Sequence, residues 1–387
     1  MALFSSENER VAEFPIAQDS IFLAHAGVTI LPARVSHAMQ DYLTKACHRM
    51  QEFPEAWRAT HETRAIAAKM IGAQASEISL LGPTSLGLSL VANGLDWQPG
   101  DEVVCYADDY PANVYPWTDL ERRGVVVRKL TPQTPGAITP ELVETALTPQ
   151  TRLVALASCH YLTGYRLQVA EIGKRLRARG ILFCLDAIQT LGAFETTVEY
   201  VDFLSADSHK WMLGPMAAGI VYVREEMQER LRPTLLGSWN VQSPQFIAQP
   251  EIVFERGGRR YEPGVLNMVG ILGMKAGLEL ILEKGVHAVS AQLLRLKEHL
   301  IRGLEPMGFH IIGPRDGPNA SGITTAFRAE GSGPSLEQIF AHLTSQKISP
   351  SLRHDRQGKA YLRFSPHFYN TIEEMDRVIE AIRLTPS

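Results

Sequence analysis

Asp202-Phe-Leu-Ser-Ala-Asp-Ser-His-Lys-Trp-Met-Leu-Gly-Pro-Met-Ala-Ala-Gly-Ile-Val-Tyr-Val223 is the stretch of sequence that decides the fold. It predicts a short apolar strand, a polar turn, a Gly/Pro-rich loop and a second apolar strand. Lys210 follows the end of the first strand. In a partly desolvated pocket, a lysine loses part of its preference for the charged form. The free amine can then attack a carbonyl carbon and form a Schiff base. From this segment alone, Lys210 could equally be an ordinary loop lysine that happens to lie beside Trp211.

A second stretch favours the reactive lysine. Ile181-Leu-Phe-Cys-Leu185 is a continuous apolar run that predicts a buried strand, and Asp186 follows it. A carboxylate at this place must be paired, because burying it alone is costly. Asp186 and Lys210 end successive predicted strands, so a parallel sheet would bring them to one edge. Pyridoxal phosphate needs such a carboxylate for its ring nitrogen and a lysine for its aldehyde. Asp186 can also cap a following helix, and both roles can hold at once.

Two motifs carry a resemblance to a known family. The motif Asp-x-x-Gln at Asp186–Gln189 and the motif Ser-His-Lys-Trp at Ser208–Trp211 resemble those of the class V aminotransferases. That family includes cysteine desulfurases, selenocysteine lyase, kynureninase and isopenicillin N epimerase-like proteins. The resemblance extends over nearly the whole chain. It implies pyridoxal 5'-phosphate as cofactor and the α/β fold type I of these transferases, with a mostly parallel central sheet in a large domain and a smaller α+β domain.

Length and composition agree with such a fold. The chain has 387 residues, 45% of them hydrophobic and 21% charged, which suits two domains. We predict a large cofactor-binding domain over 16–283 and a small C-terminal domain over 284–387, with 1–15 packed nearby. The net charge of -4 argues against nucleic acid or an anionic membrane as partner. Four widely spaced cysteines indicate no metal site. The beginning of the chain does not resemble a signal peptide, so a cytoplasmic location is expected.

A phosphate cradle is predicted where Leu80–Gly94 passes from a strand into a helix. Amides at a helix start favour an anion, and the hydroxyls of Thr84 and Ser85 add donors. A plain helix cap is the alternative, and the nearby lysine favours the cradle. The resemblance adds His209 to the phosphate ligands. Where some relatives have a phosphate-binding serine, this chain has Asp207, whose carboxylate would repel phosphate. Ser208 is therefore the expected helper.

The resemblance assigns further roles around the cofactor ring. Lys210 holds the cofactor and moves the proton at the substrate's α carbon, and Asp186 keeps the ring nitrogen protonated. Gln189 is expected to hydrogen-bond the ring hydroxyl. Tyr110 matches an aromatic residue or histidine that stacks on the ring and joins the catalytic set; a loop tyrosine packed on the core is the alternative. Kynureninase-like members carry an asparagine near the position of His160, and that asparagine contacts the ring hydroxyl. A histidine at this position can also donate or accept a hydrogen bond.

Two residues are expected to bind substrate. Arg363 alternates with apolar neighbours in Ala360–Thr371, and its planar guanidinium fits a carboxylate with two parallel hydrogen bonds. This segment resembles the family's substrate-carboxylate motif, and a surface salt bridge is the alternative. His25 lies in a segment that resembles one lying against the active site, so it is expected to touch substrate rather than serve as a turn residue. Nearby, Arg353 belongs to a polar loop of unclear role.

The reaction stays open at this point. Transamination, β-elimination with C–S cleavage, epimerisation and kynureninase-like hydrolysis all suit an amino acid substrate. Cysteine desulfurases of the family carry a nucleophilic cysteine before the final arginine motif, whereas 347–361 has none. We therefore predict no protein persulfide. A catalytically silent binding protein is the alternative outside enzymes. The resemblance also implies a homodimer, in which Gly237–Asn240 and Glu262–Asn267 reach the neighbouring subunit's phosphate.

Overall fold

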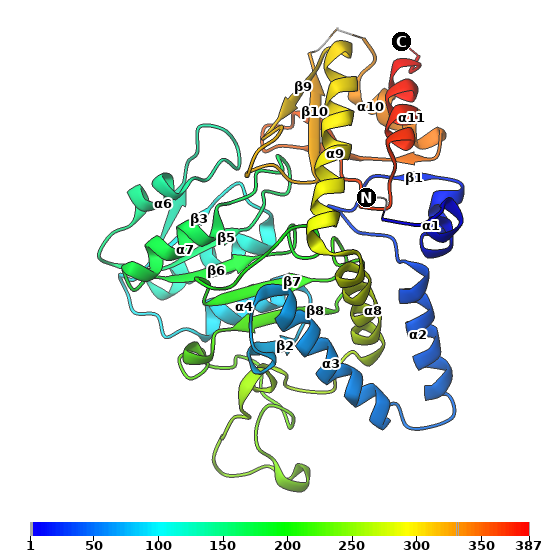
Figure 1. The fold of residues 1–387 in the computed structure, drawn as a ribbon. Coiled ribbons are helices and arrows are strands. Elements are labelled where there is room, and N and C mark those ends of the chain that lie inside the picture. The colour runs from blue at the N-terminus through cyan, green and yellow to red at the C-terminus, as the bar shows by residue number, and fades with distance from the viewer. Residues whose placement is uncertain (1–2, 330, 332, 387) are drawn as a thin grey trace.

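A seven-stranded sheet lies at the centre of the larger domain in the computed structural model, which describes residues 3–329, 331 and 333–386 (Figure 1). Five neighbouring strands pair in parallel, and β8 is antiparallel to both of its neighbours. The predicted mostly parallel α/β architecture is thus confirmed. In sheet order the strands are β2 (Ile78–Leu80), β8 (Gly219–Val223), β7 (Phe203–Asp207), β6 (Leu182–Asp186), β5 (Thr151–Ala157), β3 (Glu102–Tyr106) and β4 (Val126–Leu130).

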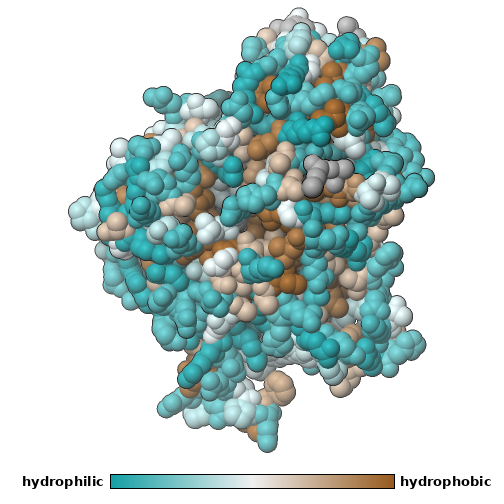
Figure 2. All heavy atoms as spheres, in the orientation of Figure 1, coloured by the Kyte–Doolittle hydropathy of each residue, from teal (hydrophilic) through white to brown (hydrophobic). Residues whose placement is uncertain are grey.

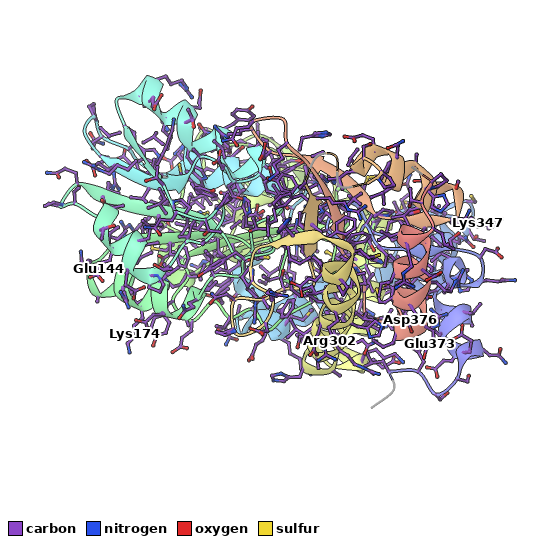
Figure 3. All side chains as sticks on the ribbon, turned by 90° about the horizontal axis from the view of Figure 1, so that it is seen from above. Glu144, Lys174, Arg302, Lys347, Glu373 and Asp376 are labelled. Atoms are coloured by element: carbon purple, nitrogen blue, oxygen red, sulfur yellow. The ribbon has the colours of Figure 1, made fainter. Side chains whose placement is uncertain are left out.

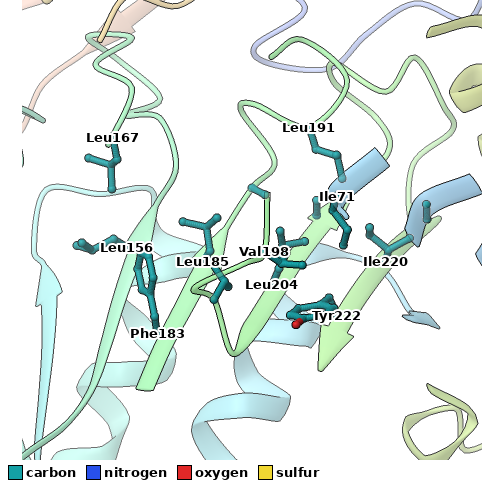
Figure 4. Packing of buried hydrophobic residues seen from close by; sticks show 14 of the residues in the cluster. Ile71, Leu156, Leu167, Phe183, Leu185, Leu191, Val198, Leu204, Ile220 and Tyr222 are labelled. Atoms are coloured by element: carbon teal, nitrogen blue, oxygen red, sulfur yellow. The ribbon is translucent and has the colours of Figure 1, made fainter. Parts of the chain in front are cut away.

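The sheet is covered on both faces, which explains its continuous apolar strands. Alternate residues of one strand enter different cores. Phe183 and Leu185 belong to the cluster that includes Ile71 of α3 (Figure 4) and apolar residues of α7 and α8, whereas Leu182 and Cys184 pack with α4. Asp186 continues the second series and therefore faces the α4 side. The helices of this domain are α2 (Ala33–Ala46), α3 (Pro54–Ile71), α4 (Thr84–Gly94), α5 (Tyr115–Thr118), α6 (Pro140–Ala146), α7 (Val169–Ala178) and α8 (Met268–Lys284).

The smaller domain is a four-stranded antiparallel sheet packed against helices, at the top of Figure 1. Its core is formed by apolar residues of the sheet and of α9, α10 and α11. The hairpin of β12 and β13 places Ser351 opposite Arg363. In sheet order the strands are β12 (Ser351–His354), β13 (Ala360–Phe364), β10 (Thr324–Arg328) and β9 (Phe309–Ile312); the helices are α9 (Val286–Leu304), α10 (Leu336–Ser345) and α11 (Ile372–Arg383).

The segment after residue 20 packs with the small domain, although the sequence suggested 16 as the start of the large one. Strand β1 (Ile21–Phe22) pairs in parallel with β11 (Ile348–Ser349), and Leu23 lies in the small-domain core. Further upstream, α1 (Glu7–Glu13) precedes Phe14, whose ring stacks on Tyr369 with centroids 4.0 Å apart. This anchoring brings the residues that follow β1 against the interface between the two domains.

Charged side chains lie mainly at the periphery, as the labelled Glu144, Lys174 and Arg302 show in Figure 3. The face in Figure 2 is correspondingly dominated by hydrophilic residues, with apolar ones exposed in patches between them. None of the helices in the described part of the chain combines the length and the apolar character needed to cross a membrane.

Lys297 on α9 is an exception to this distribution, because its side chain is buried where the helix meets β10. It is 1% exposed, and its Nζ donates a hydrogen bond of 2.6 Å to the carbonyl oxygen of Ile323. Burial lowers the pKa of Lys297 from its ordinary value of 10.5 to about 8. Keeping the amine of Lys297 charged inside the fold therefore costs free energy, and this cost depends on pH because the amine can lose its proton.

We expect this lysine to make stability depend on pH in the alkaline range. Between about pH 8 and 10.5 the unfolded chain holds a proton that folded Lys297 has lost. Stability should therefore rise with pH there, by up to about 1.4 kcal/mol per pH unit from this group. Lys297→Met should remove that component, and Lys174→Met on exposed α7 should not. Urea unfolding across this range measures the slope, and an unchanged slope in Lys297→Met would contradict the assignment.

Candidate active site

A cavity of about 410 Å³ opens at the carboxyl ends of β6 and β7, against the hairpin of the small domain. This is where ligands bind in parallel α/β sheets, because loops diverge at that edge. Three parts of the fold contribute: the segment after β1, the large-domain strand ends with the start of α4, and strands β12 and β13. The lining residues that carry polar side chains are Thr84, Ser85, Tyr110, Tyr161, Asp186, His209, Lys210, Ser351, Arg353 and Arg363.

Lys210 and Asp186 both line this cavity, as the parallel arrangement of β6 and β7 requires. Lys210 is 6% exposed, and burial lowers its pKa below the ordinary value of 10.5, with the Asp186 carboxylate acting in the opposite direction. Burial likewise raises the pKa of Asp186, although the amide of Ile188 donates to its Oδ1 over 3.0 Å. A buried amine beside a buried carboxyl is the arrangement that a carbonyl-binding lysine needs.

Tyr110 lies over the lysine. Its ring centroid is 5.3 Å from Nζ of Lys210, and its edge meets Tyr161 with centroids 5.6 Å apart. At 48% exposure, Tyr110 leaves its face open to the cavity, where a flat ring could stack. The preceding Asp109 escaped sequence analysis. Its buried carboxylate accepts from the amides of Tyr110 and Ala157 and thereby fixes this loop. The acidic pair directly after β3 was the available signal.

Thr84, Ser85 and His209 come together at the start of α4, as the predicted cradle required. The hydroxyl of Thr84 accepts from the amide of Asp207 over 2.8 Å. The Asp207 carboxylate contacts Nδ1 of His209 and accepts from the amide of Ala217. It lies behind the histidine and is not among the cavity-lining residues. The imidazole thus stands between this carboxylate and the cavity, which relieves the repulsion that the sequence suggested.

Ser208 and Gln189 do not line the cavity. The Ser208 hydroxyl donates to the carbonyl oxygen of Pro215 over 2.8 Å. Gln189 accepts from the indole nitrogen of Trp211 and donates to the carbonyl oxygen of Ala26. Since Ala26 does line the cavity, Gln189 holds one wall in place. Both side chains are turned by local hydrogen bonds that motif spacing does not reveal.

The two predicted histidines also lie outside the cavity lining. Nδ1 of His160 is 3.0 Å from the hydroxyl of Thr163, and its other ring nitrogen is 3.0 Å from a main-chain carbonyl oxygen. His25 is fully buried, with its ring nitrogens 2.6 and 3.1 Å from the hydroxyls of Thr29 and Tyr369. Burial lowers the pKa of both histidines and so favours their neutral form.

Arg363 reaches the cavity from β13 and is 1% exposed. Its Nη1 donates to the carbonyl oxygen of Tyr161 over 2.6 Å, while Nε and Nη2 have no partner among the described residues. These two nitrogens form the side of the guanidinium that binds a carboxylate with two parallel hydrogen bonds. Burial and the nearby Arg353 lower the pKa of Arg363 to about 9. A carboxylate ligand would satisfy both free nitrogens.

The cavity fits pyridoxal phosphate. Its volume lies within the range of about 300–1,000 Å³ usual for small-molecule sites. Lys210 would hold the aldehyde carbon, Asp186 the ring nitrogen, and the face of Tyr110 the ring. The start of α4 with Thr84 and Ser85 would hold the phosphate. The unpaired nitrogens of the β13 arginine remain for the substrate.

A family model described as Aminotransferase class-V matches residues 21–378. The chain belongs to the class V aminotransferase family. It is therefore an enzyme that depends on pyridoxal phosphate, and the expected fold type and cofactor are confirmed.

Proteins similar to this chain carry the names of different enzymes. A probable cysteine desulfurase of Methanothermobacter thermautotrophicus is 28% identical, with 96% of each chain covered. An isopenicillin N epimerase of Streptomyces clavuligerus is 27% identical, with 83% of each chain covered. Among solved structures, the apo cysteine desulfurase of Thermococcus onnurineus superposes with a TM-score of 0.90 at 25% identity, covering 100% of this chain and 99% of the other.

Lys210→Ala should remove the part of the visible absorbance that arises from the covalent linkage between the cofactor and the lysine, even where cofactor stays bound. Lys174→Ala, at an exposed position of α7, should keep it. Absorbance spectra of the purified proteins, recorded after incubation with excess cofactor and desalting, measure the difference. Full absorbance together with full activity in Lys210→Ala would mean that another lysine carries the cofactor.

Asp186→Ala should keep part of the cofactor but lose most turnover, because the ring nitrogen then has no carboxylate to hold its proton. A loss of about 10²-fold or more in kcat is expected, as for other groups that stabilise developing charge. Cofactor content by absorbance and kcat on the same preparation separate binding from catalysis. Near-normal turnover would rule out this role for Asp186.

Proposed function

We propose that this enzyme cleaves the Cβ–S bond of a cysteine-type amino acid and releases the sulfur directly to solvent. The observation that carries the proposal is that a buried lysine lines the cavity and none of its lining residues is a cysteine. Relatives named as cysteine desulfurases support C–S chemistry. The cavity has the parts for an amino acid substrate, namely a base at Lys210 and a carboxylate receptor at Arg363.

The proposed roles follow from the geometry. Arg363 binds the substrate carboxylate through its free Nε and Nη2 and thereby orients the α carbon toward Lys210. Bound pyridoxal phosphate supplies the electron sink for the reaction. The amine of Lys210 takes the proton from the α carbon. The Cβ–S bond then breaks with its electron pair on sulfur, which leaves as a thiolate, and water converts the three-carbon remainder to pyruvate and ammonia.

The cysteines of the chain are poorly suited to carry a persulfide. Cys47 is exposed after α2, and the other three are buried. Burial raises the pKa of Cys159 to about 11 and that of Cys105 to about 12. Cys184 lies on the same side of β6 as Asp186, and burial raises its pKa well above its ordinary value. Since reactivity follows the thiolate, the three buried thiols are unreactive at neutral pH, and Cys47 is not among the residues that line the cavity.

Epimerisation is the second candidate function, favoured by the isopenicillin N epimerase relative. It begins with removal of the same α proton and differs in returning a proton to the opposite face. A screen of amino acids, with and without keto acids, analysed by chiral chromatography and mass spectrometry, separates epimerisation, transamination and elimination.

We also propose a homodimer. Apolar side chains are exposed on the loop that projects at the bottom of Figure 1: Leu235, Leu236, Phe246, Ile247, Ile252 and Val253. Asn240 and Glu262 are buried, and Glu262 pairs with Arg64 within its own chain. A contact from these loops to a neighbour's phosphate would therefore come from main-chain groups or from the exposed Ser238 and Asn267.

Replacing all four cysteines by alanine tests the direct release of sulfur. If the variant folds and binds cofactor, kcat/KM for sulfur release should fall by less than about tenfold, or about 1.4 kcal/mol. Sulfide formation and pyruvate formation are measured together and should stay equal. Loss of sulfur release in the folded, cofactor-loaded variant would contradict direct release, as would a persulfide trapped on any cysteine during turnover.

A further inference from the structure

A second arginine converges with Arg363 in the cavity. Arg353 lies on β12 two residues from Ser351, which pairs with Arg363 across the hairpin, so all three side chains share one face. A β carbon built on Gly27 would lie 3.2 Å from Nη2 of Arg353 and 3.6 Å from Nη2 of Arg363. The two guanidinium groups therefore meet beside the same point of the chain. Because position 27 is glycine, the space between them stays open.

Neither arginine has a carboxylate partner in the described part of the chain. Nε of Arg353 is buried without a hydrogen bond, as are Nε and Nη2 of Arg363. Arg356, a few residues further along, shows the contrast: it pairs with Asp108 at the surface. Two unpaired like charges that converge in a desolvated place repel each other. Their arrangement is favourable when anionic groups of a ligand lie between them.

One carboxylate does not account for both arginines. The α-carboxylate of the substrate fully occupies the free Nε and Nη2 of Arg363. The cofactor phosphate has its own donors at the start of α4, on the large-domain side of the cavity. Among the described residues, Asp186 is the only carboxylate that lines the cavity, and its assigned partner is the cofactor ring. Arg353 is thus left as a cation with no assigned anion.

We propose that Arg353 binds a second anionic group of the substrate, so that the enzyme acts on amino acids whose side chain ends in a carboxylate or a sulfur oxyanion. This inference rests on the proposed function in taking a cysteine-type amino acid as the substrate. In the C–S reaction the anionic group leaves together with the sulfur. Arg353 then determines which substrates are accepted, while Arg363 and Lys210 act on the part that all amino acids share.

Binding of unreactive acids tests the subsite apart from turnover. Succinate and glutarate carry two carboxylates, and butyrate carries one. Calorimetric titration of the cofactor-loaded enzyme should show that a diacid binds more tightly than butyrate, by about 10- to 100-fold, as for other paired charges. Arg353→Gln should remove this advantage. Arg356→Gln, from the same loop, should preserve it, and unchanged cofactor absorbance checks that each variant is intact.

Kinetics with three cysteine derivatives complete the test. Arg353→Gln should raise KM for S-carboxymethylcysteine and cysteine S-sulfonate, with little change for S-methylcysteine. Equal binding of diacids and butyrate by the wild type would overturn the subsite, as would an equal loss for all three derivatives in Arg353→Gln. If the diacid preference is found but no sulfur is released from any derivative, the proposed C–S cleavage fails and the second anion subsite stands.

Discussion

The burial of Lys210 beside Asp186 is the constraint on which the rest of the site depends. An amine and a carboxyl group, both withdrawn from water, would destabilise the fold if either were alone. Each favours the charged form of the other, and burial opposes both. The sheet makes the pairing possible, because β6 and β7 run in parallel and end at one edge. Helix α4 begins at the same edge and adds donors for an anion.

The small domain completes the cavity with positively charged side chains. Strands β12 and β13 bring Arg353 and Arg363, and the segment after β1 supplies the wall at Gly27. This segment is held from two sides, by pairing with β11 and by the hydrogen bond from Gln189 to Ala26. In the proposed function, the large domain therefore provides the groups for the cofactor, and the small domain provides those that bind the substrate.

The sequence predicted those residues whose role depends on the end of an element. Asp186, Lys210, Thr84 and Ser85 follow strands or begin a helix, and each lines the cavity as expected. Gln189 and Ser208 lie close to them in sequence but face other partners, and so do His25 and His160 in other loops. Neighbouring residues of a loop can point to different sides. Ser208 is turned by its hydrogen bond to Pro215, and His160 by its hydrogen bond to Thr163. No periodicity describes such choices.

The sequence by itself determined the alternation of buried strands and helices, the family, and the lysine and carboxylate that meet in the cavity. These follow from local patterns, because the order of apolar and polar residues along the chain indicates which segments are buried and where each strand or helix ends. Only the tertiary structure decided that Asp207 lies behind His209 and that Arg353 converges with Arg363. The first relation depends on which way a loop turns, and the second depends on the register of the hairpin of β12 and β13. Charged groups at such short distances interact strongly only after the folded chain has withdrawn them from water.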